Sequence, residues 1–167
     1  ESSVSNINGK KGILSYRGYS IEELAKKSTF EESSYLLLFG QLPTQTELEE
    51  FAAKVTEHRK LPNDLIKILK SLPKETKPMD VLQMAVSSLG TFYNLEVSPE
   101  MVKGKKYNKD YFMNTSAALI GALGSIVAAW HRIRSDQNPI SSNPESTYAE
   151  NFLLMLGSEK ITPLMTR

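Results

Sequence analysis

From Ser20 onward, apolar residues recur every three or four positions in segments that end at glycine or proline. Residues with this spacing share one face of a helix, so the pattern is typical of amphipathic helices packed against a core. One such stripe consists of Leu48, Phe51, Ala52 and Val55, and another of Leu82, Ala85, Val86 and Leu89. The pattern predicts an all-α fold for this part of the chain.

Start and stop signals divide this region into separate helices. Ser20 with Glu23, and Thr44 with Glu47, have the spacing of a capping box. Gly40 predicts a left-handed helix end, and Pro78 fits the first turn of a helix because its missing N–H is not needed there. We expect helices at residues 20–27, around 35–39, and at 44–59, 62–72, 78–93, 107–134 and 148–157, with one more beginning at Thr162.

Only the N-terminus has strand character. Val4 to Ile7 and Ile13 to Leu14 flank the dipeptide Asn8-Gly9. Asn-Gly supplies the positive φ angles that a tight hairpin turn requires. A short β-hairpin is therefore expected before the first helix.

The longest predicted helix carries small residues along one stripe. They are Ala117, Gly121, Gly124, Ser125 and Ala128. Small side chains let another helix approach closely, so this stripe predicts a close helix contact. The surrounding apolar run, Ala117 to Trp130, is too short to cross a hydrocarbon core of about 30 Å, and we interpret it as a buried helix of a protein outside the membrane.

Composition favours one soluble domain and excludes several function classes. The 20 basic and 19 acidic residues nearly cancel, which argues against a nucleic-acid partner. Cysteine is absent, which excludes disulfides, thiolate metal sites and cysteine nucleophiles and fits a reducing compartment such as the cytoplasm. The sequence contains no internal repeat that would suggest a second domain.

The residues offer few candidates for chemistry. His58 and His131 are far apart in sequence, and we interpret both as polar residues near helix ends. The acidic pairs at residues 22–23, 31–32 and 49–50 point in different directions on a helix and cannot act together as an acid and a base. Lys103, Lys105, Lys106 and Lys109 could contact an anion, but a solvated charge run is the preferred interpretation. We therefore predict no catalytic, cofactor-binding or metal-binding residue in this chain.

Several motifs occur together in one order. The run from Gly12 to Thr44 contains Gly-Ile-Leu-x-Tyr-Arg-Gly-Tyr followed by Tyr-Leu-Leu-Leu-x-Gly-x-Leu-Pro-Thr. Further matches are Ser2 to Ser5 before Ile7 to Gly9, then His58 to Pro62, Pro78 to Leu82 and Tyr148 to Leu153. Over nearly the whole chain, this series resembles the N-terminal part of the large domain of bacterial-type citrate synthases. Lys77 and Gly124 depart from that pattern, where histidine and proline are usual, at positions that are not catalytic in the family.

The resemblance implies the fold and activity of that family. Such enzymes are homodimers with a mostly helical large domain and a small domain that closes over oxaloacetate and acetyl-CoA. An aspartate and two histidines catalyse the condensation, and hydrolysis of the citryl thioester then releases citrate and coenzyme A in the tricarboxylic acid cycle. By the same resemblance, the helices at residues 78–93 and 107–134 are expected to pair across the dimer axis. We assign the stripe through Gly121 and Ser125 to that interface.

In the family, the catalytic residues follow the position that corresponds to Arg167. We therefore expect residues 1–167 to be an inactive piece of a longer enzyme, lacking the small domain and the rest of the large domain and serving as a dimerisation scaffold. Acetyl-CoA would be a substrate of the whole enzyme and not a ligand of this part. Two alternatives are a piece of a 2-methylcitrate synthase, which uses propionyl-CoA, and a non-enzymatic helical dimerisation module.

Overall fold

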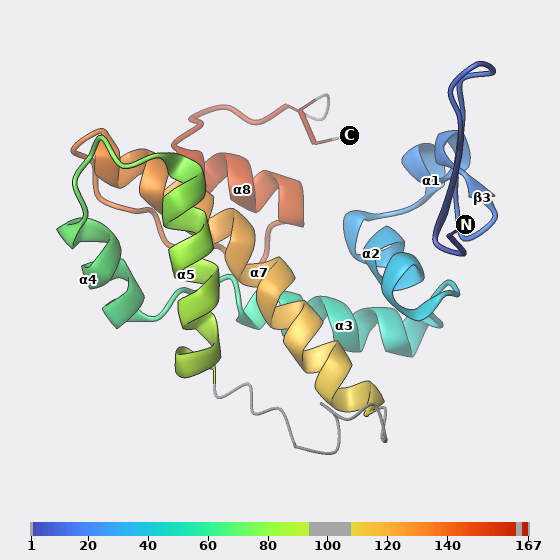
Figure 1. Ribbon diagram of the computed structural model, residues 1–167, viewed down its shortest axis with the longest axis horizontal. Coiled ribbons are helices and arrows are strands. Elements are labelled where there is room, and N and C mark those ends of the chain that lie inside the picture. Colours follow the sequence, from blue (N-terminus) through green and yellow to red (C-terminus); the bar gives the residue numbers. More distant parts are fainter. Residues whose placement is uncertain (1, 94–107, 163–164, 167) are drawn as a thin grey trace. The chain divides into compact units, whose positions relative to one another are not determined.

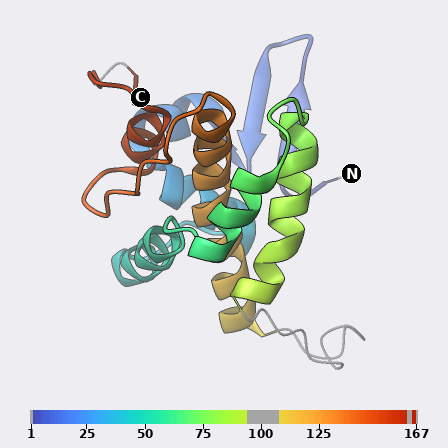
Figure 2. The same cartoon turned by 90° about the vertical axis from the view of Figure 1, so that its left-hand side faces the viewer.

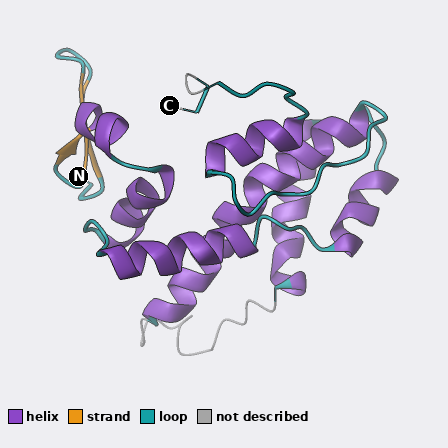
Figure 3. Ribbon diagram, turned by 180° about the vertical axis from the view of Figure 1, so that it is seen from behind, coloured by secondary structure: helices purple, strands orange, loops and turns teal. Residues whose placement is uncertain are grey.

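The computed structural model describes residues 2–93, 108–162 and 165–166, and within them the protein is mostly helical (Figure 1). Seven helices and one three-stranded sheet occur in this described part of the chain. The strands are confined to the N-terminal residues (Figure 3). The chain divides into two compact units, Glu1–Ala53 and Lys54–Thr166. The predicted all-α fold with a short N-terminal hairpin is confirmed.

The sheet of the first unit is larger than the hairpin predicted from sequence. It consists of β1 (Ser5–Asn8), β2 (Ile13–Tyr16) and β3 (Tyr19–Ser20), joined antiparallel in the order β1-β2-β3. The third strand follows a tight turn in which Arg17 and Gly18 have φ angles of 50° and 92°. This turn has no clear signal in the sequence, because it contains an arginine where such turns usually have asparagine or glycine.

The tight turn predicted at Asn8-Gly9, with positive φ angles at these residues, is wrong. Four residues, 9–12, connect β1 to β2, and the positive φ angle belongs to Gly12 at 65°. A two-residue turn would have paired Ile7 with Lys10, whereas the observed register pairs Ile7 with Leu14. The longer loop keeps the charged side chains of Lys10 and Lys11 outside the ladder, where both residues are exposed.

Helix caps define the helices of the first unit. In α1 (Ile21–Lys27) the backbone N–H of Glu23 donates to the Ser20 hydroxyl, and Thr29 caps α2 (Phe30–Phe39) in the same way. Gly40 ends α2 with a φ of 86°, as predicted. The Arg17 guanidinium donates to the carbonyl of Leu37 at 3.0 Å, which fixes the β2–β3 turn to the end of α2.

Aromatic side chains fill the space between α2 and α3 (Gln45–Glu57). Tyr35 and Phe51 are fully buried, with ring centroids 5.7 Å apart and ring planes nearly perpendicular. The predicted capping box at the start of α3 is confirmed, because the Glu47 N–H donates to the Thr44 hydroxyl while the Glu47 carboxylate accepts from the Thr44 N–H.

The second unit is built around one long helix. It contains α4 (Asn63–Ser71), α5 (Pro78–Phe92), α7 (Lys109–Arg134) and α8 (Tyr148–Leu156). Both α5 and α8 pack against α7; α5 crosses α7 obliquely in Figure 1 and lies beside it in Figure 2. The core consists of buried residues of α4, α5 and α7: Leu65, Leu69, Val81, Ala85, Leu89, Ala122, Ile126, Ala129, Trp130 and Ile133. By length and hydropathy α7 could span a membrane, but more than half of its apolar window is buried, as in a core helix.

The small residues of α7 make close contacts within the chain. A Cβ atom at Gly121 would overlap the carbonyl oxygen of Val55 at the end of α3. At Gly124, it would lie 3.3 Å from the Tyr148 hydroxyl of α8. The close contact predicted for this stripe is confirmed, but its assignment to the dimer axis is wrong, because elements of the same chain already cover it. The spacing of the small residues identified the contact face of α7 but not the elements that pack against it.

Candidate functional site

The two histidines lie at different places and face different neighbours. His58 follows α3, its Nδ1 is 2.8 Å from the carbonyl oxygen of Lys54, and its ring meets the edge of Tyr93 with centroids 4.8 Å apart. His131 lies in the last turn of α7. Burial raises the pKa of the neighbouring Tyr93 hydroxyl, so this phenol stays protonated at neutral pH. The structure thus places the histidines near helix ends and does not bring them together.

The other sequence candidates are also dispersed. Glu22 and Glu23 occupy the first turn of α1, and Glu31 and Glu32 the first turn of α2, where carboxylates favour the positive end of the helix dipole. Among the described residues, no cluster of three histidine or acidic side chains could hold a metal ion. Lys109 begins α7, whereas Lys103, Lys105 and Lys106 lie outside the described residues.

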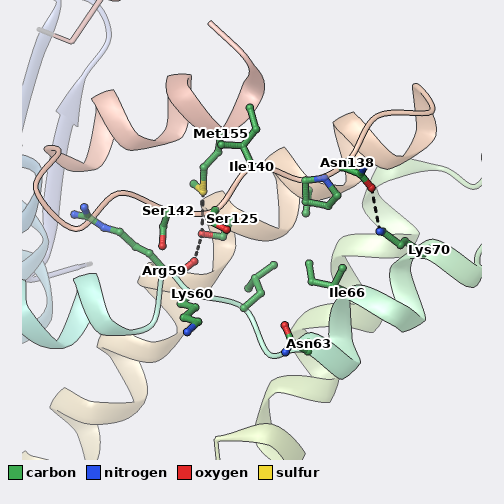
Figure 4. Close-up of a pocket in the computed structure, with 14 residues that line it drawn as sticks. Arg59, Lys60, Asn63, Ile66, Lys70, Ser125, Asn138, Ile140, Ser142 and Met155 are labelled. Atoms are coloured by element: carbon green, nitrogen blue, oxygen red, sulfur yellow. Dashed lines mark hydrogen bonds between the residues drawn. The ribbon is translucent and has the colours of Figure 1, made fainter.

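A pocket of about 310 Å³ lies within the second unit (Figure 4). Three segments distant in sequence form its walls. They are residues 59–70 with α4, the loop 138–142, and the facing surfaces of α7 and α8 through Ser125, Ala129 and Met155. This pocket was not predicted from the sequence. In the sequence, the pocket corresponds to a Pro- and Ser-rich loop and to a basic tripeptide, His58 to Lys60. Nothing in these two segments indicates that they lie close together in the fold.

Arg59 is the buried cation of this pocket and has a structural role. Its side chain is 3% exposed, and its Nη1 donates to the carbonyl of Ser146 at 2.8 Å. Its guanidinium carbon lies 5.3 Å from the centroid of the Tyr148 ring, a distance at which a cation is attracted to an aromatic face. The carbonyl of Arg59 accepts a 2.7 Å hydrogen bond from Ser125. Arg59 therefore joins the α3–α4 junction to α7 and to the start of α8.

Hydrogen bonds hold the loop that forms the outer wall. The side chain of Asn138 accepts from Lys70 at 3.2 Å (Figure 4). Its main-chain carbonyl accepts from Arg132 at 2.7 Å. Further along, the N–H of Asn143 donates to the buried side chain of Asn151 at 2.7 Å. These bonds fix the loop to α4, α7 and α8, so the pocket is preformed.

A capping box begins α8 directly after this loop. The Thr147 hydroxyl accepts from the Glu150 N–H while the Glu150 carboxylate accepts from the Thr147 N–H. Hydrogen bonds from the backbone and hydroxyl of Thr147 lower the pKa of Glu150. The ionised carboxylate therefore stabilises the start of α8.

The pocket provides hydrogen-bond donors and positive charge. Its lining includes Arg59, Lys60 and Lys70 together with the amides of Asn63 and Asn138, and no carboxylate or histidine is among its lining residues. Such a surface can hold an anionic or hydrogen-bond-accepting group. It lacks the positioned base that proton abstraction requires.

A second, mainly apolar groove of about 220 Å³ lies between α5 and α7. Its lining consists of Pro78, Val81, Leu82, Ile126, Val127, Trp130, His131 and Arg134. Val127 is 41% exposed, and Met79, which follows Pro78 in the first turn of α5, is 69% exposed. The groove therefore presents apolar side chains at the surface of the second unit.

Comparison with known proteins matches the whole chain to one family. The family model "Citrate synthase, C-terminal domain" matches residues 1–167. The citrate synthases of Synechocystis and Acidithiobacillus ferridurans are each 38% identical over 167 residues, which is 100% of this chain and 40% and 42% of theirs. The chain thus spans about two fifths of the length of these curated relatives.

Solved structures agree with this match. Citrate synthase from Pyrobaculum aerophilum superposes with a TM-score of 0.85 at 33% identity, over 98% of this chain and 41% of that chain. The Thermoplasma acidophilum enzyme, solved with carboxymethyl coenzyme A and oxaloacetate, superposes with a TM-score of 0.81 at 30% identity, over 98% and 41%. On the sequence match and the shared fold, the chain belongs to the citrate synthase family.

Proposed function

We propose that residues 1–167 form the N-terminal helical part of the large domain of a citrate synthase that acts in the cytoplasm. The whole enzyme condenses acetyl-CoA with oxaloacetate and hydrolyses the citryl thioester to citrate and coenzyme A. The supporting observation is the family match along all 167 residues, together with the same fold in an enzyme solved with a coenzyme A derivative and oxaloacetate.

The part of the enzyme in this chain supplies scaffold rather than catalytic groups. Its histidines are separate, and its cationic pocket contains no base. The buried contacts of Arg59, Ser125 and Gly121 instead hold the helices of the second unit together. The residues that deprotonate acetyl-CoA and bind oxaloacetate belong to the rest of the enzyme.

The scaffold also carries the surface for a second copy, formed by α5 and α7. The stripe through Gly121 is occupied within the chain, so the dimer contact uses the other side of these helices, around the apolar groove that Val127 lines. An isologous interface requires an apolar surface that fits its own copy, and Met79 and Val127 expose such a surface.

An assay of coenzyme A release tests the catalytic proposal. The chain of 167 residues and the longer gene product that contains it are each incubated with oxaloacetate and either acetyl-CoA or propionyl-CoA. We expect release only by the longer protein and a higher kcat/KM with acetyl-CoA. A higher kcat/KM with propionyl-CoA would identify a 2-methylcitrate synthase. A gene product of 167 residues that dimerises without activity would instead identify a non-enzymatic module.

A further inference from the structure

The dipeptide Asn8-Gly9 lies at the exposed end of the β1–β2 hairpin and has no role in the proposed function. Both residues are exposed, and the loop that follows contains Lys10 and Lys11. We propose that Asn8 is a site of spontaneous covalent modification, at which its side-chain amide is converted to aspartate and isoaspartate. The inference depends on the local chemistry of the hairpin and not on the enzymatic activity.

The reaction needs only the chain and water. The backbone nitrogen of Gly9 attacks Cγ of Asn8 and loses its proton, a C–N bond forms, the bond from Cγ to Nδ2 breaks, and ammonia leaves. The product is a five-membered succinimide. Water then opens either of its two carbonyls, which yields aspartate or isoaspartate without any oxidant or reductant.

The structure leaves the attacking nitrogen accessible. A Cβ atom placed on Gly9 would meet no heavy atom within 4 Å, so the space beside this residue is open. Glycine also has the widest choice of backbone conformations, which lets Asn8 and Gly9 reach the geometry of the ring at low cost. A residue with a side chain would hinder both the approach and the conformational change.

The carbonyl under attack is polarised. Oδ1 of Asn8 accepts a hydrogen bond from the backbone N–H of Lys11 at 3.2 Å. Negative charge develops on this oxygen as Gly9 attacks, and a donor already in place stabilises that charge. The ammonium groups of Lys10 and Lys11 add positive charge nearby, which favours the deprotonated backbone nitrogen and the carboxylate product.

The other asparagines of the described part lack this combination. Asn138 and Asn143 precede prolines, which have no backbone N–H to lose. Asn6 lies inside β1, opposite Ser15, whereas Asn8 is the last residue of that strand, and Ile7, which follows Asn6, is β-branched. The rest cap or lie within helices and are followed by residues with side chains: Asn63, Asn108, Asn114 and Asn151. The modification is therefore expected to be selective for Asn8.

Incubation of the folded chain at mildly alkaline pH, followed by peptide mapping, tests the proposal. Mass spectrometry measures the amide-to-acid exchange at each asparagine, and labelling by an isoaspartyl methyltransferase identifies the isoaspartate. We expect Asn8 to convert before every other asparagine of the described part. We expect Gly9→Ala to slow the conversion by about tenfold, which corresponds to about 1.4 kcal/mol in the barrier.

Two controls make the result decisive. Gly9 has open space around it and is not among the residues with positive φ, so Gly9→Ala should retain the fold, which circular dichroism checks. Asn6→Gln changes the other asparagine of the hairpin and should leave the conversion at Asn8 unaltered. Conversion of Asn8 in urea but not in the folded chain would overturn the proposal, as would an unchanged rate in Gly9→Ala.

Discussion

The hydroxyl of Ser125, in the middle of α7, donates a 2.7 Å hydrogen bond to the main-chain carbonyl of Arg59, 66 residues earlier in the sequence. Ser125 is 4% exposed, so this bond lies away from water. It supplies a buried donor to a main-chain carbonyl that follows the end of α3. The bond thus fixes the α3–α4 junction to the central helix.

We expect Ser125→Ala to destabilise the protein by about 1–3 kcal/mol, because the carbonyl of Arg59 would lose its buried donor. Ser88→Ala is the matched control, since the Ser88 hydroxyl bonds only to Ala85, one turn earlier in α5. Urea unfolding followed by circular dichroism measures both free energies of unfolding. Equal effects of the two substitutions would contradict a special role for the bond to Arg59.

Gly121→Ala is expected to lower the free energy of unfolding by about 1–3 kcal/mol, because the new methyl group would overlap the carbonyl oxygen of Val55. Gly90→Ala provides the opposite case. Gly90 is exposed in α5, and no heavy atom lies within 4 Å of the place that the new methyl group would take, so alanine should stabilise the helix by about 0.5–1 kcal/mol. Thermal unfolding of the two variants should shift in opposite directions.

Val127→Lys is expected to weaken the proposed dimer, because it places a charge in the apolar groove between α5 and α7. Val127 is 41% exposed, so the fold of each copy should tolerate the change. The control is Ile68→Lys, at a position that is 38% exposed on α4 and does not line the groove. Sedimentation velocity would show a larger monomer fraction for Val127→Lys alone. Unaltered association would place the interface elsewhere.

The free energy of unfolding should depend on pH through the carboxylate of Glu150 at the start of α8. Its pKa is lowered below 4.5 in the folded protein by hydrogen bonds from Thr147. A carboxyl whose pKa falls on folding contributes stability above its unfolded-state pKa and loses it as the pH falls through the folded-state value. The stability difference between the wild type and Glu150→Gln should therefore shrink as the pH is lowered below 4.5. Urea unfolding of both proteins across this pH range measures the difference. A difference that stays constant would show that the helix cap does not depend on the charge of Glu150.

The helices could be predicted because their signals are local. Ser20, Thr44 and Gly40 act on backbone groups within a few residues, and each occupies the cap that its residue type favours. The start of α2 at Phe30 was less evident, although Thr29 caps it in the same way. The sequence does carry the capping-box spacing here, since Glu32 follows three residues after Thr29, but in the structure the Glu32 carboxylate accepts a hydrogen bond from the Ser28 hydroxyl.

The errors concern features that depend on distant residues. The turn at Asn8-Gly9 has the composition of a two-residue loop, but the pairing of Ile7 with Leu14 requires a longer one. The spacing of small residues in α7 identified a close contact, but only the folded structure shows that α3 and α8 make it. The cationic pocket was missed for the same reason, because its walls meet only in the folded unit.

The bond between Arg59 and Ser146 joins positions 87 residues apart, and this separation has a consequence for synthesis on the ribosome. During translation, the guanidinium of Arg59 emerges long before the carbonyl that will accept its hydrogen bond. Burial of this cation before the chain has been extended through Ser146 would forgo that hydrogen bond, which makes the burial more costly. We therefore expect the second unit to close around Arg59 late in translation, after α7 has emerged and the start of α8 has followed.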